Sequence, residues 1–209
     1  YSGIDLHSNN CVICVADEED KVVAEKRLPN DLNKILQFLQ PWQQELASVA
    51  VESTYNWYWL VDGLEDHGYP VVLANPARMK QYDGLKHTDD VSDAFVRCEL
   101  MRLGILPTSQ LYDRQTRPVR DLLRRRMLMV QLRTSLILSF KSLNERTLGQ
   151  RVPLARVKAM SIEEAQARFA APADQLLSGE QIGLMGQLQE SIARIEKQCG
   201  TASPDANCQ

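Results

Sequence analysis

The chain has 209 residues, of which 44% are hydrophobic and 24% are charged, and its formal net charge is −3. This composition is typical of a soluble globular protein, and the length suits one domain with an appended helical region. No apolar run approaches the roughly 20 residues of a membrane span and no signal peptide is evident, so a soluble protein is expected. The five cysteines, at irregular spacing, favour a reducing compartment over a disulfide framework.

Three short strands are predicted at the start of the chain. Apolar runs at residues 1–7, 11–17 and 21–28 are separated by the polar links 8–10 and 18–20, which are typical of hairpin turns. Cys11 and Cys14 lie three apart within the second strand and so face opposite sides of it. Buried or half-exposed thiols are therefore favoured over a zinc site.

Helices and strands then alternate. Asn30 is a suitable cap for a helix over residues 31–40, and a strand follows at 47–52. Ser53 or Thr54 caps a predicted helix that continues to residue 65, before a strand at 69–74 and a helix start at Pro76. A helix is also predicted at 90–102. Three hairpin-joined strands followed by alternating helices and strands is the order of the ribonuclease-H-like, or RuvC-like, α/β fold with a mixed sheet.

Four carboxylates fall where such a fold brings its elements together. Asp5 lies on the first strand, Glu52 ends the fourth, and Asp90 and Asp93 share one face at the start of the 90–102 helix. Without a cation, two carboxylates about 4 Å apart would repel by roughly 4 kcal/mol at an effective dielectric near 20. We therefore predict that these four residues form a catalytic site for Mg²⁺, with Mn²⁺ able to substitute, since Mg²⁺ prefers oxygen ligands. His7 shares the strand face of Asp5.

A set of motifs in this order resembles the DEDD transposases of the insertion-sequence 110 family, which are related to the Piv DNA invertase. The motifs are Gly3-Ile4-Asp5, Val51-Glu52-Ser53-Thr54, Asn75-Pro76, His87-Thr88-Asp89-Asp90-Val91-Ser92-Asp93-Ala94, Leu103-Gly104-Ile105-Leu106-Pro107 and Arg117-Pro118-Val119-Arg120-Asp121-Leu122-Leu123. The resemblance covers roughly residues 1–150. It maps the family's four acids onto Asp5, Glu52, Asp90 and Asp93, with Asp89 as the alternative to Asp90.

The resemblance implies a transposase or site-specific recombinase that binds DNA and a guide RNA, in the bacterial cytoplasm with the nucleoid. Such transposases carry a second domain with a serine nucleophile, which we do not find within residues 150–209, so we expect this chain to be incomplete for recombination. A RuvC-like Holliday-junction resolvase or nuclease, and a non-catalytic assembly fragment, stay open as alternatives. An actin-like sugar kinase also begins with Gly-Ile-Asp, but residues 6–9 lack the glycine and threonine of its phosphate loop.

Charge is distributed unevenly along the chain. Residues 1–113 contain 9 Lys and Arg against 18 Asp and Glu, whereas residues 114–158 contain 12 against 2. A basic block between acidic regions indicates a polyanionic partner. Six arginines of this block are predicted to bind nucleic acid: Arg117, Arg120, Arg124, Arg125, Arg126 and Arg133. The alternative is a packed helix whose arginines are merely solvated.

We expect three regions: a catalytic domain at 1–113, a long basic helix at 114–150 and a helical or coiled-coil region at 151–209. Thr116 is predicted to cap the long helix and Gly149 to end it. A capping-box pattern at Ser161 opens a helix to about residue 170, and residues 181–198 carry a partial heptad pattern. This second pattern fits either a bundle helix or a coiled-coil arm. Together with the apolar surface of the long helix, it predicts a homodimer or tetramer.

Overall fold

The structure is a computed structural model that describes residues 1–85 and 93–201. Its internal contacts divide the chain into two compact units, Tyr1–Leu111 and Tyr112–Gln209. No helix in the described ranges is long and apolar enough to cross a membrane.

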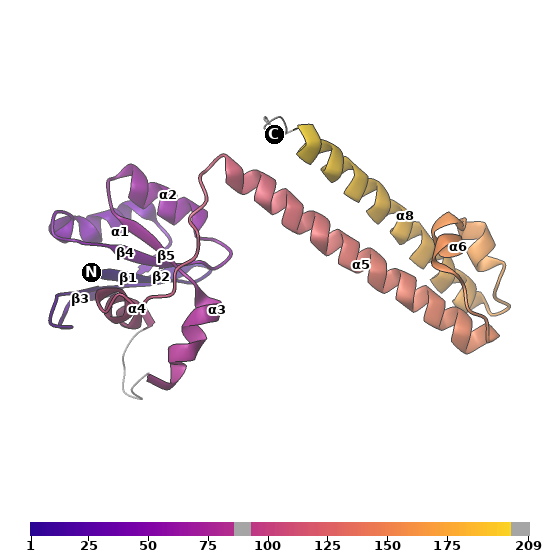
Figure 1. Ribbon diagram of the computed structural model, residues 1–209, viewed down its shortest axis with the longest axis horizontal. Coiled ribbons are helices and arrows are strands. Elements are labelled where there is room, and N and C mark those ends of the chain that lie inside the picture. The colour runs from indigo at the N-terminus through magenta and orange to yellow at the C-terminus, as the bar shows by residue number, and fades with distance from the viewer. Residues whose placement is uncertain (86–92, 202–209) are drawn as a thin grey trace, which may run out of the picture. The chain divides into compact units, whose positions relative to one another are not determined.

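The N-terminal unit is built on a five-stranded sheet in the order β3-β2-β1-β4-β5 (Figure 1). Its strands are β1 (Ser2–Leu6), β2 (Asn10–Ala16), β3 (Val22–Pro29), β4 (Val49–Glu52) and β5 (Val71–Ala74). The first three form an antiparallel meander, while β4 pairs parallel with β1 and β5 pairs parallel with β4. This mixed sheet confirms the predicted ribonuclease-H-like fold class.

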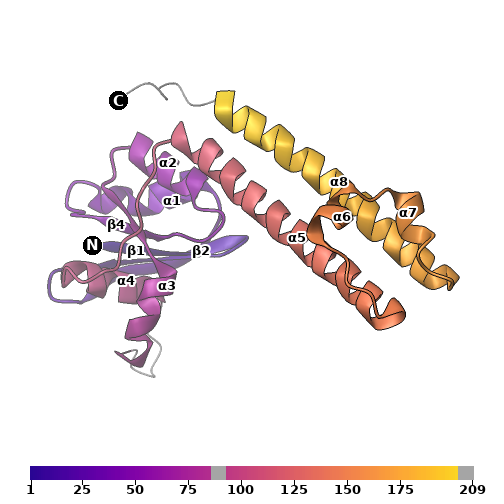
Figure 2. The ribbon, with the colours of Figure 1, turned by 45° about the vertical axis from the view of Figure 1, so that its right-hand side comes forward.

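Helices cover both faces of the sheet (Figures 1 and 2). On one face lie α1 (Leu32–Leu39) and α2 (Tyr58–Asp66), and on the other lies α4 (Asp93–Arg102). Alternate residues of β1 serve the two faces: Ile4 and Leu6 belong to the core under α1 and α2. Asp5 is therefore on the side of α4. Within the described part of the unit there are also three short helical segments: η1 (Gln40–Trp42), α3 (Pro76–Met79) and η2 (Lys80–Leu85).

Two predicted helix starts are wrong. The side chain of Asp31, rather than Asn30, caps α1 by accepting from the backbone amides of Asn33 and Lys34. The helix predicted from residue 53 or 54 begins only at Tyr58. The intervening loop is held instead by Asn56, whose amide Nδ2 donates to the carbonyl of His7 at 2.9 Å.

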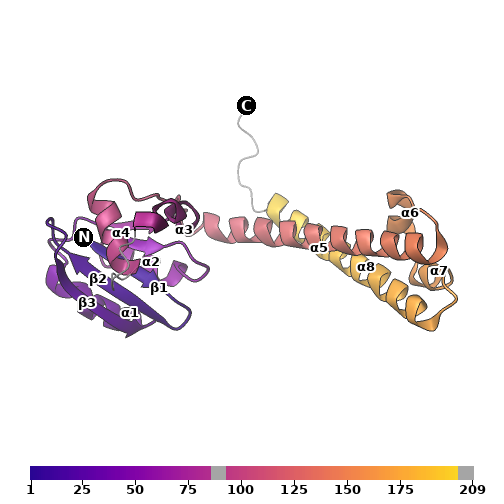
Figure 3. The same cartoon turned by 90° about the horizontal axis from the view of Figure 1, so that it is seen from below.

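The second unit is a hairpin of two long helices, α5 (Thr116–Leu148) and α8 (Pro172–Thr201) (Figures 2 and 3). The short helices α6 (Leu154–Ala159) and α7 (Ile162–Gln166) lie at its closed end. The hairpin core is apolar and is centred on the fully buried Phe140. Because α8 is continuous from Pro172, it is longer than the predicted 181–198 segment; proline is tolerated in a first turn.

The ends of α5 and α7 follow local rules. Gly149 ends α5 in the left-handed conformation (φ 64°), as predicted. Asp113 performs the capping that the sequence assigned to Thr116, because its carboxylate accepts from the amides of Gln115 and Thr116. Ser161 forms the predicted capping box with Glu164, although α7 ends at Gln166, four residues early.

Two polar side chains, Asn144 and Ser178, are fully buried among the described residues of the hairpin. Asn144 donates from Nδ2 to the carbonyl of Phe140 at 2.8 Å, and its Oδ1 accepts from Nε of Arg168 at 2.6 Å. Both ends of its amide are thus engaged, which removes most of the penalty of burying it.

Candidate active site

The helix α4 lies directly against the backbone of β1. A Cβ atom built on Gly3 would be 2.0 Å from the carbonyl oxygen of Ala94, so any larger residue at this position would push the helix away. Cys98, one turn further along α4, donates from Sγ to the carbonyl of Cys14 on β2. This close approach brings the inward side chains of α4 to the level of Asp5, two residues after Gly3.

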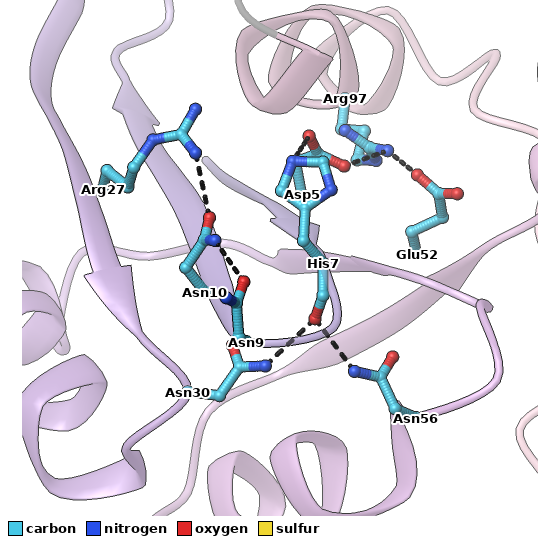
Figure 4. Close-up of polar contacts among 9 residues, drawn as sticks. All are labelled: Asp5, His7, Asn9, Asn10, Arg27, Asn30, Glu52, Asn56 and Arg97. Carbon is cyan, nitrogen blue, oxygen red and sulfur yellow. Dashed lines mark hydrogen bonds and ion pairs between the residues drawn. The ribbon is translucent and has the colours of Figure 1, made fainter.

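Two of the predicted acids, Asp5 and Glu52, contact the same side-chain nitrogen of Arg97 on this helix (Figure 4). Nη2 of Arg97 lies 3.1 Å from Oδ1 of Asp5 and is in direct contact with Oε2 of Glu52. Because each contact is about 3 Å or less, the two carboxylate oxygens are within about 6 Å of each other. Residues 47 positions apart in the sequence therefore share one site, at adjacent parallel strands.

Arg97 is only 3% exposed, which is unusual for a charged side chain. Burial lowers the pKa of its guanidinium, and the charge of Asp5 partly opposes this shift. The guanidinium still carries its charge at neutral pH, because arginine stays protonated in proteins even when buried. Its Nε and Nη1 atoms are buried without a hydrogen-bond partner among the described residues. The guanidinium is thus charge-paired but incompletely hydrogen-bonded.

His7 holds the other oxygen of Asp5. Its Nε2 lies 3.1 Å from Oδ2, and the imidazole is half exposed. The backbone of His7 is fixed in turn, because its carbonyl accepts from Nδ2 of Asn30 at 3.0 Å and from Nδ2 of Asn56 at 2.9 Å (Figure 4). The predicted shared face of His7 and Asp5 therefore becomes a direct contact.

Asp93 begins α4, one turn before Arg97. Together with Glu52 and Arg97 it lines a pocket of about 210 Å³, whose remaining wall includes Lys80 and Tyr82. Asp90, the fourth predicted acid, lies outside the described residues.

The donor set suits a hard divalent cation, because all four predicted ligands are carboxylates. However, no three His, Cys, Asp or Glu side chains within residues 1–85 and 93–201 lie close enough together to hold a metal ion. A cationic group already lies between two of the acids, since Arg97 contacts both Asp5 and Glu52. The four acids thus suit a metal ion by their chemistry. Two of them, Asp5 and Glu52, lie close together with the guanidinium of Arg97 between them.

The cysteines of the second strand face opposite sides, as predicted. Cys11 packs in the core under α1 and α2, and burial together with the charge of Asp5 raises its pKa to about 11. Cys14 lies on the α4 side, where a hydrogen bond with Cys98 and burial raise its pKa. Cys11 and Cys14 therefore hold their protons at neutral pH.

The six predicted nucleic-acid-binding arginines have different environments. Arg117 is 4% exposed and donates from Nε to the carbonyl of Tyr112 at 2.7 Å. Arg120 stacks over the ring of Tyr112, and Arg126 and Arg133 reach across the hairpin to Glu196 and Gln189 of α8. Arg124 and Arg125 are exposed on α5 and are the better candidates for phosphate contacts.

Sequence reasoning missed Arg97. A signal was present, because Ala94, Arg97 and Cys98 follow one another at the spacing of a single helix face. An arginine on the apolar stripe of a helix needs a buried counter-charge. The nearest acid on the same helix face is Asp93, four residues earlier. The structure supplies the counter-charge from Asp5 and Glu52 of the sheet.

Comparison with known protein families supports these observations. A family model described as transposase, that of the DEDD transposases of insertion sequence 110, matches residues 2–146. No curated protein matches the chain. The matched region includes the whole sheet, the four predicted acids and most of α5. Since the match covers more than half of the sequence, the chain belongs to the DEDD transposases of the insertion-sequence 110 family.

Proposed function

We propose that the N-terminal unit carries out Mg²⁺-dependent phosphodiester chemistry in DNA transposition, with Asp5, Glu52, Asp90 and Asp93 as its catalytic carboxylates. The observation that carries this proposal is the meeting of Asp5 and Glu52 at a single nitrogen atom. Carboxylates gathered on neighbouring strand ends need a positive charge between them, and their oxygens are the ligands that Mg²⁺ prefers.

The chain's own residues prepare such a site. Asp5 is oriented by His7, Glu52 ends β4 beside it, and Asp93 of α4 lines a pocket together with Glu52. Lys80 on the wall of that pocket is placed to attract a phosphate group. When bound, Mg²⁺ or Mn²⁺ would polarise the scissile phosphate and stabilise charge on the departing oxygen.

We further propose that DNA contacts the basic helix α5 through its exposed arginines. Arg124 and Arg125 support this, since they project from α5 within the segment that holds 12 basic residues against 2 acidic ones. Arginine suits this role, because its planar guanidinium forms paired hydrogen bonds with phosphate. A guide RNA is the second proposed partner, and binding to DNA would place the protein with the bacterial nucleoid.

Self-association is also part of the proposal. Leu132 and Leu136 of α5 and Leu184 and Leu188 of α8 line an open groove of about 620 Å³ along the hairpin. Apolar side chains gathered on a surface gain free energy when a second protein surface excludes water from them. A second copy of the chain is the proposed occupant, giving a dimer or tetramer.

The catalytic proposal is tested by two measurements on the same preparations: Mn²⁺ binding by electron paramagnetic resonance, and Mg²⁺-dependent cleavage of linear and branched duplex DNA. Asp5→Asn and Glu52→Gln should each lower cleavage by about 100-fold or more and remove Mn²⁺ binding. Glu19→Gln, which alters an exposed acid at a hairpin tip, is the matched control. Undiminished cleavage in Asp5→Asn would refute the assignment, and paired symmetric nicks in a four-way junction would favour a resolvase.

A further inference from the structure

The place between Asp5 and Glu52 is filled by part of the protein itself. Arg97 reaches it from α4, and its Nη2 atom contacts the carboxylate of each acid. The oxygens engaged in this way, Oδ1 of Asp5 and Oε2 of Glu52, face each other across the site. Those oxygens would have to approach a divalent cation to about 2.1 Å. The guanidinium nitrogen and a metal ion cannot both occupy that place.

We propose that Arg97 is a built-in counter-ion for Asp5 and Glu52, which takes the place of a divalent cation and keeps metal affinity low until it is displaced. This inference rests on the proposed function, in which the same acids hold the metal. It adds that one of the two negative charges of the acid pair is already compensated in the metal-free protein.

Charge supports the proposal. Asp5 and Glu52 together supply two negative charges, and Arg97 compensates one of them from a position that is almost fully buried. A fixed positive charge at contact distance opposes the arrival of another cation, and it does so more strongly in a buried site, where solvent screens less.

Hydrogen bonding explains why the arginine can leave. Nε and Nη1 of Arg97 are buried without partners among the described residues, so a single nitrogen carries both ion pairs. A guanidinium fixed permanently between two carboxylates would normally engage them through several donors. The pocket lined by Arg97, Lys80 and Asp93 is adjacent, and it offers the side chain space into which to move.

The closeness of α4 to β1 makes the arrangement specific. Gly3 allows the backbone of Ala94 to approach, which brings Arg97, one turn later, over Asp5. Arg102, further along the same helix, pairs instead with Asp20 at the hairpin tip. The helix therefore carries one arginine in the acid site and one outside it, and these two make a matched pair for experiment.

The decisive experiment compares Mn²⁺ binding and thermal stability in the wild-type chain and in Arg97→Met. We expect Arg97→Met to bind Mn²⁺ at least about tenfold more tightly, because a fixed opposing charge has been removed. Its thermal midpoint should be below that of wild type in metal-free buffer and should rise with Mn²⁺, whereas the wild-type midpoint should change little.

Three controls locate the effect. Arg102→Met removes an arginine from the same helix and should leave Mn²⁺ affinity at the wild-type level. Arg97→Lys keeps a positive charge and should bind Mn²⁺ weakly, as wild type does. Adding Asp5→Asn to Arg97→Met should abolish the gain, which would place the ion at this acid pair.

The outcomes separate this inference from the proposed function. A wild-type dissociation constant for Mn²⁺ below about 10 µM, with that binding lost in Asp5→Asn, would overturn the counter-ion role of Arg97. The proposed metal site would then still stand. Absence of Mn²⁺ binding in both wild type and Arg97→Met would refute both. If Arg97→Met does not fold even with Mn²⁺, Arg97→Gln repeats the comparison with a neutral side chain that can still hydrogen-bond, and unchanged affinity in that variant would overturn the inference.

Discussion

The two units of this transposase use buried and exposed surface in opposite ways. The N-terminal unit packs apolar side chains on both faces of its sheet and buries an arginine between two acids. The helical unit, in its described residues, has one core near its closed end and leaves Leu132, Leu138 and Leu184 exposed along the long helices. The first unit therefore suits exact placement of reacting groups, and the second suits contacts with other molecules.

Charge follows the same division. Acidic residues outnumber basic ones by 18 to 9 in residues 1–113, and basic residues outnumber acidic ones by 12 to 2 in residues 114–158. An acidic surface repels DNA unless a cation intervenes, whereas a basic helix attracts it along its length. Affinity and chemistry are thus expected to be separable by mutation.

The largest contrast is expected between two glycines. Gly3→Ala should destabilise the N-terminal unit by about 3 kcal/mol, because the new Cβ would overlap the carbonyl of Ala94. Gly186→Ala, on α8 with no atom within 4 Å of the added carbon, should instead stabilise the helical unit by about 0.5–1 kcal/mol.

The two effects can be read separately in denaturant titrations. All three tryptophans, Trp42, Trp57 and Trp59, lie in the N-terminal unit, so their fluorescence reports that unit alone. Circular dichroism at the helix band is weighted towards the long helices. Unchanged fluorescence midpoints in Gly3→Ala would contradict the close packing of α4 on β1.

The second contrast concerns self-association. Leu132→Glu combined with Leu184→Glu places charges in the groove of the hairpin and should weaken association by about tenfold or more, as measured by light scattering over a concentration series. Leu176→Glu, at a leucine that is 63% exposed outside the groove, is the control and should associate normally. A wild-type chain that stays monomeric at all concentrations would remove the basis for this prediction.

A third prediction separates the two roles of arginine. Affinity for duplex DNA is expected to fall with salt, and Arg124→Gln with Arg125→Gln should make the slope of log affinity against log salt less negative. The change should be up to about 1.8 on DNA of any sequence, because each phosphate contact contributes about −0.9 to the slope. Fluorescence anisotropy at several salt concentrations measures this slope. Arg194→Gln makes the same chemical change in α8, outside the basic block, and should have little effect. Equal slopes in all three proteins would show that these arginines are only solvated.

The smallest effect is expected at an exposed ion pair. Glu196→Gln breaks the ion pair between Glu196, whose side chain is 48% exposed, and Arg126, whose side chain is 35% exposed. The free energy of unfolding should fall by less than about 1 kcal/mol, because solvent screens such pairs. Thermal unfolding followed by circular dichroism provides the measurement. A loss above about 2 kcal/mol would mean that this pair holds the hairpin together, unlike an ordinary surface pair.

Much of the N-terminal fold followed from alternation and turn residues. The three N-terminal strands and the start of the helix at Pro76 were predicted nearly to the residue, because each depends on neighbours in sequence. The start of α2 was not, since Ser53 and Thr54 have the chemistry of caps. What delays the helix is the contact between Asn56 and His7, which spans 49 residues and leaves no local pattern.

The site was predictable in part, because the strands that carry Asp5 and Glu52 were predicted from local patterns. Parallel strands that end at one edge bring Asp5 and Glu52 together, which their positions on predicted strands indicated. Arg97 depends on how deeply α4 approaches the sheet, and Gly3 controls this through a contact that periodicity does not reveal. The burial of Arg117 likewise depends on Tyr112, whose carbonyl it contacts just before α5 begins.

The buried Asn144 has a consequence for how the elements of the hairpin are aligned. Oδ1 of Asn144 accepts from Arg168, which lies in the segment between α7 and α8. A slide of α5 past that segment by one turn would leave the amide oxygen without this partner in an apolar core, at a cost of about 1–3 kcal/mol. The amide therefore favours the observed alignment of α5 with the closed end of the hairpin.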